Sequence, residues 1–143
     1  MNGAGDGAGG RVHRVPIKVR FYELDPYGHL NHSAFVQYFE VGRVELLEEV
    51  GLGLDELHER GYHFVVNRIE THFLAPVMPG DTVVVETGVI EMRRASSRWA
   101  QRMVRGDEEV ARQELRAAVT DVEGRPVRVP PEIVERLRPY LRA

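Results

Sequence analysis

The chain has 143 residues, of which 43% are hydrophobic and 29% charged, a balance typical of one folded globular domain. Its formal charge of -3 comes from interspersed acidic and basic residues, so it has no basic arm of the kind that binds nucleic acid. Cysteine is absent, which excludes thiol nucleophiles, disulfide bonds and thiolate metal sites.

The N-terminal residues predict a tail rather than a targeting signal. Residues 1–10 are rich in Gly and Ala and have neither the basic nor the apolar region of a signal peptide. No stretch has the length and apolar content of a transmembrane helix. We therefore expect a cytoplasmic protein without a membrane partner, a flexible Gly-rich tail at residues 1–11, and a single domain at residues 12–143.

The first predicted elements are a strand and a long helix. Residues 15–21 alternate apolar and polar side chains, as a half-buried strand does. Residues 23–31 then contain a proline and a glycine close together, which force a turn and place Asp25 on a loop. Residues 33–50 lack proline and repeat apolar side chains every three or four positions, which predicts an amphipathic helix of about five turns, covered on more than one side.

A short helix and four strands are predicted next. Glycines flank residues 54–60, which read as the short helix. Strand-like segments follow at about residues 63–75, 82–94, 97–106 and 109–122, and their hairpin-length connections predict antiparallel neighbours. A final helix is predicted at residues 132–141. The layout is α+β, with the helices on one side of an antiparallel sheet.

Asp25 lies on a tight loop directly before the long helix, and this arrangement suits acyl transfer. A helix N-terminus offers unpaired N–H groups and a partial positive charge, which can polarise a thioester carbonyl. A carboxylate beside it can serve as nucleophile or general base. Ordinary turn and capping chemistry is the alternative interpretation. His29 and His32 could pair on a metal, but no third ligand follows at a suitable spacing, and we expect no metal.

The sequence around this loop resembles a known signature. Residues 19–32 read VRFYELDPYGHLNH, and Phe35, Tyr38, Phe39, Glu40 and Arg43 follow. This segment is similar to the signature of the 4-hydroxybenzoyl-CoA thioesterase family of hotdog proteins. The likeness extends over about residues 15–141 and is greatest to bacterial acyl-CoA thioesterases with the DxxxHxN form.

The resemblance implies a hotdog fold, in which an antiparallel sheet wraps around one long central helix, and hydrolysis of an acyl-coenzyme A thioester without a cofactor. Asp25 matches the family's catalytic aspartate. His29 and Asn31 match the polar positions that shape the loop, and the backbone amides of His32 and Ser33 match the donors to the thioester oxygen. The family forms homodimers with the active site at the interface, and these frequently assemble into homotetramers.

Substrate contacts are expected at two places. Near the loop we assign Tyr27, Gly28 and Phe35 to substrate binding. Farther along, the hairpin at residues 93–98 gathers guanidinium and hydroxyl groups that suit the phosphates of coenzyme A, and from it we assign Arg94, Ser96, Ser97 and Arg98. A solvated basic turn is the alternative interpretation of this hairpin. We expect Trp99 in the core or at an interface.

Other interpretations stay open. Glu40 could replace Asp25 as the base, because some hotdog thioesterases use a helical glutamate. Some family members have Asp at position 23, and Tyr is often found at position 31, where this chain has Glu23 and Asn31. These departures leave the substrate class open. The alternative function is a non-catalytic module that binds acyl-CoA or acyl-carrier protein on the same fold. A thioesterase acting on acyl-carrier protein is a further candidate, whereas the His-bearing motif of a hydratase is absent.

Overall fold

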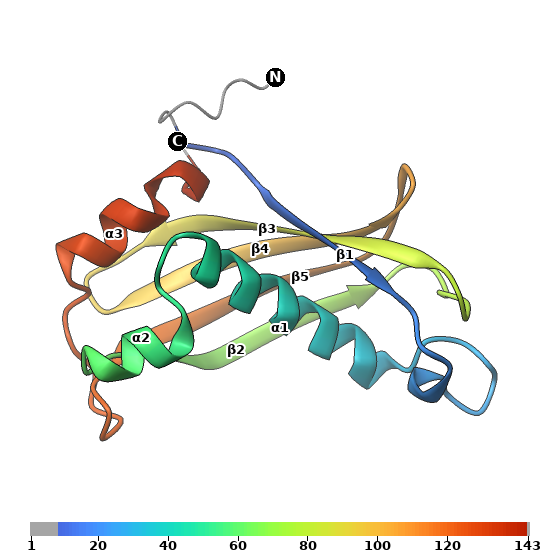
Figure 1. Ribbon diagram of the computed structural model, residues 1–143, viewed down its shortest axis with the longest axis horizontal. Coiled ribbons are helices and arrows are strands. Elements are labelled where there is room, and N and C mark those ends of the chain that lie inside the picture. Colours follow the sequence, from blue (N-terminus) through green and yellow to red (C-terminus); the bar gives the residue numbers. More distant parts are fainter. Residues whose placement is uncertain (1–8, 143) are drawn as a thin grey trace.

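The computed structural model describes residues 9–142, which form a five-stranded antiparallel sheet with one long helix across one face (Figure 1). The strands are β1 (His13–Lys18), β2 (His63–Phe73), β3 (Thr82–Met92), β4 (Ser96–Arg105) and β5 (Glu108–Thr120), in the spatial order β1-β3-β4-β5-β2. The helices are α1 (His32–Glu49), α2 (Leu54–Glu59) and α3 (Pro131–Leu137), with short 3-10 turns η2 (Phe21–Glu23) and η3 (Arg138–Tyr140). The predicted α+β layout is confirmed.

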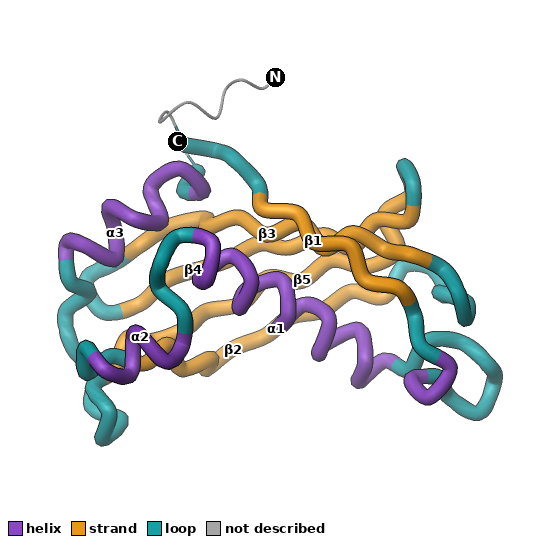
Figure 2. Tube along the Cα trace, viewed as in Figure 1, coloured by secondary structure: helices purple, strands orange, loops and turns teal. Residues whose placement is uncertain are grey.

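The helices lie on one side of the sheet, and α1 runs along it (Figure 2). The N-terminus of α1 lies at the end of the sheet where η2 is found, and α2 and α3 lie toward the other end (Figure 1). The loop that carries Asp25 and the hairpin between β3 and β4 are therefore at opposite ends of the subunit.

The first strand is shorter than predicted. Residues 15–21 were expected to be extended, but β1 ends at Lys18 and Phe21 is 82% exposed. Lys18 pairs with Thr82, the first residue of β3, so the chain has no neighbouring strand beyond this point and turns into η2. A strand needs a partner for its backbone groups, and alternation of side chains does not supply one.

The last two residues of the predicted tail, Gly10 and Arg11, form backbone hydrogen bonds with the C-terminal segment. Residues 1–8 of this prediction lie outside the described residues. Gly10 N–H donates to the carbonyl of Leu141 at 2.7 Å, and Arg11 N–H donates to that of Pro139 at 3.0 Å. The chain is thus attached to the C-terminal segment from residue 10, slightly before the predicted start of the domain.

The core between α1 and the sheet has two apolar parts. One surrounds the first half of α1 and includes Phe35, Phe39 and Met103. The other surrounds the second half and includes Leu46 and Trp99, whose 2% exposure confirms its predicted place in the core. Burial of these large side chains is the main source of stability.

A row of polar side chains, which we call the polar belt, crosses the sheet on the α1 side. Its members are Thr87, Gln101, Gln113 and Thr71, which pair in register across β3, β4, β5 and β2. Gly42 of α1 lies directly against this belt, because a Cβ at this position would be 2.8 Å from Thr87 Oγ1 and 3.0 Å from Gln101 Nε2. The missing side chain lets the helix approach the sheet closely.

Candidate active site

The loop before α1 is closed by local backbone hydrogen bonds. Leu24 and Leu30 form an isolated antiparallel bridge, and Asp25 N–H donates to the carbonyl of His29 at 2.7 Å. Gly28 N–H donates to the carbonyl of Asp25 at 3.0 Å. The φ angle of Gly28 is 82°, a conformation that glycine adopts without steric cost. The proline and glycine of this segment thus produce the predicted turn.

The Asp25 carboxylate is held in a fixed orientation. Its Oδ1 accepts the backbone N–H of Tyr27 at 2.8 Å and that of His29 at 3.1 Å. Among the residues that the structure describes, Oδ2 has no hydrogen-bond partner. One oxygen therefore orients the group and the other is available for chemistry.

Asn31 caps the helix that follows. Its Oδ1 accepts both the backbone N–H and the hydroxyl of Ser33, at 2.9 and 2.8 Å. The prediction that the Ser33 amide serves a thioester oxygen is therefore wrong for this conformation, because the cap already uses that N–H. The N–H of His32, the first residue of α1, has no acceptor within residues 9–142, and it remains the candidate donor.

An open depression of about 300 Å³ lies at this helix start. Its lining residues come from the loop, from α1 and from the end of β2: Asp25, His29, Leu30, His32, Phe35, Phe73, Leu74, Ala75 and Pro76. The rings of Phe35 and Phe73 pack edge to face at 5.3 Å. The structure thus brings four predicted residues together, Asp25, His29, His32 and Phe35. Tyr27, which is 85% exposed, and Gly28 do not line the depression.

The basic hairpin differs from its predicted role. Ser97 is fully buried, and its hydroxyl donates to the carbonyl of Ala117 and accepts the indole N–H of Trp99 at 2.8 Å. Its assignment to phosphate binding is therefore wrong. Arg98 forms ion pairs with Glu91 and Glu114, so its charge is already matched. Arg94 is exposed, and its guanidinium has no partner in the described part of the chain.

A contact between Tyr38 and Glu23 also supports the loop, and the sequence did not reveal it. The hydroxyl of Tyr38, on α1, donates to the carboxylate of Glu23, two residues before Asp25. Burial and this hydrogen bond to Glu23 raise the pKa of Tyr38 well above its usual range, so the hydroxyl keeps its proton. The carbonyl of Glu23 accepts the N–H of Asn31 at 2.9 Å. Glu23 therefore ties the entry of the loop to its exit and to the helix.

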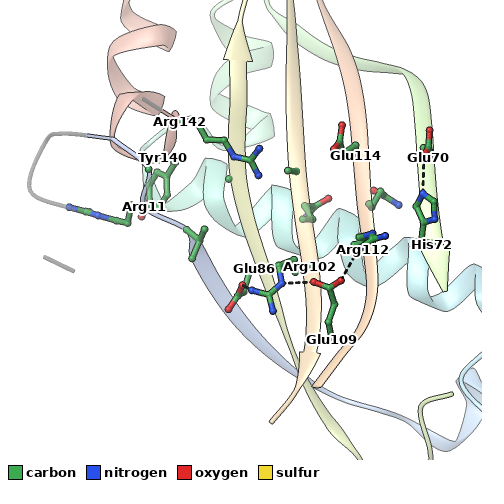
Figure 3. Close-up of a pocket in the computed structure, with 16 residues that line it drawn as sticks. Arg11, Glu70, His72, Glu86, Arg102, Glu109, Arg112, Glu114, Tyr140 and Arg142 are labelled. Carbon is green, nitrogen blue, oxygen red and sulfur yellow. Dashed lines mark hydrogen bonds and ion pairs between the residues drawn. The ribbon is translucent and has the colours of Figure 1, made fainter. Parts of the chain in front are cut away.

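A second depression, on the sheet face away from α1, is lined by charges of both signs (Figure 3). Arg102 pairs with Glu86 and Glu109, and Arg112 approaches Glu109 at 3.4 Å. Figure 3 shows these side chains pointing toward one another across neighbouring strands. The charges of this face largely neutralise each other, and we assign no chemistry to it.

Residues 9–142 contain neither a cluster of side chains suited to a metal ion nor a helix that could span a membrane. No group of three or more His, Asp or Glu side chains is arranged to hold a metal ion. His29, His32 and Asp25 border the same depression, but their side chains are not arranged to hold a metal ion. No helix of this part of the chain is long and apolar enough to cross a membrane.

Known proteins resemble this chain in sequence and in fold. It is 30% identical over 132 residues to the acyl-acyl carrier protein thioesterase ATL3 of Arabidopsis thaliana, a match that covers 91% of this chain and 70% of that protein. It is 27% identical over 94 residues to the acyl-CoA thioester hydrolase YbgC of Escherichia coli, covering 66% and 70%. A thioesterase from Thermus thermophilus, solved with coenzyme A and Zn, is 34% identical with a TM-score of 0.77, covering 87% of this chain and 91% of that one.

The family model of the thioesterase-like superfamily matches residues 19–137. This stretch includes the Asp25 loop, all three α-helices and four of the five strands. The resemblance inferred from the loop signature is confirmed, and so is the hotdog fold. The chain belongs to the thioesterase-like superfamily and is a hotdog-fold thioester hydrolase.

Proposed function

We propose that this enzyme hydrolyses acyl-coenzyme A thioesters to the free acid and coenzyme A, with Asp25 as nucleophile or general base. The observation that carries the proposal is the state of the Asp25 carboxylate. Two backbone N–H groups hold Oδ1, while the carboxylate borders an open depression beside a helix N-terminus. The name of the Escherichia coli relative and the coenzyme A in the Thermus thermophilus structure support the choice of carrier.

Each group at the helix start has a role in this proposal. The thioester oxygen points toward the N-terminus of α1, where the free N–H of His32 and the helix dipole stabilise the charge that develops on it. The carbonyl carbon lies against Asp25. In direct attack, a carboxylate oxygen of Asp25 bonds to the carbonyl carbon, the C–S bond breaks to release coenzyme A as a thiolate, and water then hydrolyses the resulting anhydride to free acid and Asp25. In the other route, Asp25 takes a proton from a water molecule whose oxygen attacks the carbonyl carbon, and the C–S bond breaks to give the free acid and coenzyme A, which receives the proton. His29 and Asn31 act by shaping the loop and the cap rather than by touching the reacting atoms.

The experiment measures coenzyme A release from short-chain, long-chain and phenylacyl thioesters by the wild type and by Asp25→Asn. The amide oxygen of Asn can still accept the N–H groups of Tyr27 and His29, but the side chain can neither attack nor take a proton. We expect kcat/KM to fall at least about 100-fold, with thermal unfolding unchanged. Asp107→Asn, in the exposed turn between β4 and β5, is the matched control and should retain activity.

Other outcomes of this experiment have defined meanings. Turnover that survives in Asp25→Asn would refute the role of Asp25 and make Glu40, which is exposed on α1, the next base to test. Absence of turnover on every thioester, together with measurable binding, would favour the non-catalytic binding module.

Acyl-carrier protein is the second candidate carrier, because the Arabidopsis thaliana relative is named for it. The two carriers are separated by comparing kcat/KM for the same acyl group on coenzyme A and on acyl-carrier protein. If kcat/KM is at least tenfold higher with acyl-carrier protein, a difference of about 1.4 kcal/mol, then acyl-carrier protein and not coenzyme A is the carrier. We place the enzyme in the cytoplasm with either carrier, which cell fractionation tests.

We further propose that two copies associate through β2 as a homodimer. This edge strand has eleven residues, and Val65, Val66, Ile69 and Phe73 on it are between 39% and 48% exposed. The other edge strand, β1, has only six residues and contains a proline, which protects it from pairing. Light scattering should give a molar mass of twice the chain mass of 16.3 kDa for a dimer, or four times this mass for a tetramer. The Ile69→Lys variant should lower the measured mass toward that of one chain.

In this dimer, the basic hairpin at residues 93–98 of one subunit lies near the Asp25 site of its partner. β3 has eleven residues, about 35 Å, and separates the end near Asp25 from the hairpin at residues 93–98. Antiparallel pairing of two β2 strands brings the hairpin end of one copy to the Asp25 end of the other. We propose that Arg94 serves the partner's site. Mixed dimers of Asp25→Asn and Arg94→Ala then contain one intact site and recover activity, whereas contact within one subunit gives no recovery.

A further inference from the structure

Two adjacent rows of like charge cross the sheet on its outer face, the face away from α1. Arg98, Arg116 and Arg68 lie directly opposite one another on β4, β5 and β2, and we call them the arginine row. Two residues along, Glu114 on β5 and Glu70 on β2 are also opposite each other and form the glutamate row (Figure 3). All five side chains line one open depression of about 250 Å³.

The arginine row is not neutralised within one subunit. Like charges directly opposite each other on neighbouring strands are destabilising. Arg98 has carboxylate partners on both sides. In the described part of the chain, however, neither Arg68 nor Arg116 forms an ion pair, and Arg116 donates to the neutral Oδ1 of Asn67 at 3.2 Å. Both rows end on β2, an edge strand, so a positive and a negative row end lie side by side at the free edge.

The free edge of β2 restricts how a second copy can pair with it. Residues directly opposite each other in an antiparallel sheet point to the same face, so a two-fold axis must pass through one residue and its copy. If that residue is Arg68 or Glu70, two identical charges meet at the axis. If it is Thr71, fewer than half of the eleven residues of β2 can pair. An axis nearer the start of β2 falls on the bulge between Val66 and Arg68, where pairing is irregular. Ile69 avoids these faults.

An axis at Ile69 joins the two rows across the interface. Arg68 of one copy is then opposite the partner's Glu70, and Glu70 is opposite the partner's Arg68. Each arginine row continues into the glutamate row of the other copy, so its unmatched end meets the opposite charge. On the α1 side the two Ile69 side chains, each 42% exposed in the single subunit, cover one another. Charge and apolar contact therefore favour the same register.

This register also adds a wall to the catalytic depression. The bulge in β2 shifts the pairing by one residue, so Phe73 of one copy faces the partner's Phe64. Both rings lie on the α1 side, where Phe73 borders the depression at Asp25 and Phe64 packs edge to face on Trp99 at 6.0 Å. Phe73 is 48% exposed in the single subunit. The partner's Phe64 covers it and completes the apolar side of the site.

We propose that this charge pattern specifies the homodimer, with the two-fold axis at Ile69 and with Arg68 and Glu70 pairing reciprocally between the two copies. The inference rests on the dimer of the proposed function and defines its register. A chain of the same fold with other charges at these two positions does not match both rows. The pattern therefore also selects identical chains as partners.

Single cysteines test the axis directly, because the chain has no cysteine of its own. Only a residue on the axis faces its own copy, with Cα atoms about 5.5 Å apart, a separation that a disulfide can bridge. Ile69→Cys should therefore form a covalent dimer under mild oxidation at least about tenfold faster than the matched variants Arg68→Cys, Glu70→Cys and Thr71→Cys. Fastest cross-linking at any of the other three positions would overturn the proposed axis.

Charge reversal tests the pairing itself. Arg68→Glu places two carboxylates opposite each other at both contacts, and Glu70→Arg does the same with guanidinium groups. Each should weaken the homodimer at least about tenfold in analytical ultracentrifugation. Each subunit should still fold, because the reversal removes a like charge from its own row. Arg125→Glu and Glu123→Arg, in the exposed turn after β5, change the net charge equally and should leave the dimer unchanged.

Mixing the two reversed variants gives the sharpest result. A chain with Arg68→Glu and a chain with Glu70→Arg place opposite charges at both contacts, so native mass spectrometry should show mainly the heterodimer. Random pairing, or variant homodimers as stable as the wild type, would overturn the inference.

Coenzyme A release is a separate readout. At a dilution where the variant homodimers dissociate, each variant should lose release and the mixture should recover it. Release that persists in the dissociated variants would show that the partner's Phe64 does not complete the site. Failure of the proposed function is distinguishable, because cross-linking and pairing are measured without a thioester. If both follow the prediction but no thioester is hydrolysed, the function fails and the register stands.

Discussion

Replacing Gly42 by alanine tests the close approach of α1 to the sheet. In an exposed helix this change is stabilising by about 1 kcal/mol. Here the new Cβ would lie 2.6 Å from Val85 Cγ1 and 2.8 Å from Thr87 Oγ1. Ordinary carbon contacts are about 3.5–4.0 Å, so the helix must move away from the polar belt. Overpacking of this kind costs about 1–3 kcal/mol, which exceeds or cancels the gain in helix propensity.

We therefore expect Gly42→Ala to lower the free energy of unfolding by up to about 2 kcal/mol, which corresponds to a fall in Tm of several degrees, roughly 3–8 °C. Urea denaturation and thermal unfolding monitored by circular dichroism measure this. Glu45→Ala, at an exposed position of the same helix, is the control and should change the stability by less than about 0.5 kcal/mol. A rise in stability of about 1 kcal/mol in Gly42→Ala would show that helix propensity alone decides and would refute the close packing.

Three further changes have defined outcomes. Asn31→Ala removes the cap of α1 and should cost about 1 kcal/mol in urea denaturation, whereas Asn31→Asp should restore the stability, and equal loss in both would contradict the capping role. Tyr38→Phe leaves the Glu23 carboxylate without its buried donor and should cost about 1.5–3 kcal/mol; an unchanged midpoint would mean that this contact is unimportant in solution. The N–H of Met78 and the guanidinium of Arg105 hold the pKa of Asp81 below its usual range. The ionised carboxylate therefore stabilises the folded state at pH values above the ordinary carboxyl pKa. This stabilisation is lost as the pH falls through the lowered pKa that Asp81 has in the folded protein. Asp81→Asn should therefore be destabilising near neutral pH and much less so near about pH 3, and an equal effect at both would refute the assignment.

The site was predictable where it depends on neighbours in the sequence. The Asp25 loop follows from a proline and a glycine next to the start of a helix, and the contacts that orient Asp25 come from Tyr27 and His29. Ser97 was assigned wrongly because its face of the strand is set by pairing with Ala117 on β5. A hairpin sequence shows which side chains are polar, but the register decides which of them are buried.

The supporting contacts were hidden because they join distant residues. Tyr38 and Glu23 are fifteen positions apart, and Arg43 and Gln101 are separated by fifty-eight. A signal for the belt did exist, since Gln101 lies between the inward apolar residues Trp99 and Met103, and Gln113 lies between Ala111 and Leu115. Without the strand register, however, that pattern does not show which helix residue the two glutamines meet.

The sequence by itself determined the order of helices and strands, the α+β class, the turn at Asp25 and the helix that starts beside it. These features depend on side-chain periodicity, on glycine and proline conformations and on capping, which act over a few residues. Only the tertiary structure decided that β1 ends where β3 begins, that the Ser33 amide is used by the cap, that the hairpin lies far from Asp25, and that Arg43 donates to Gln101 and Gln113 of the sheet. These features depend on which strands pair and how closely the helix packs on them, and such contacts are formed by the whole chain at once.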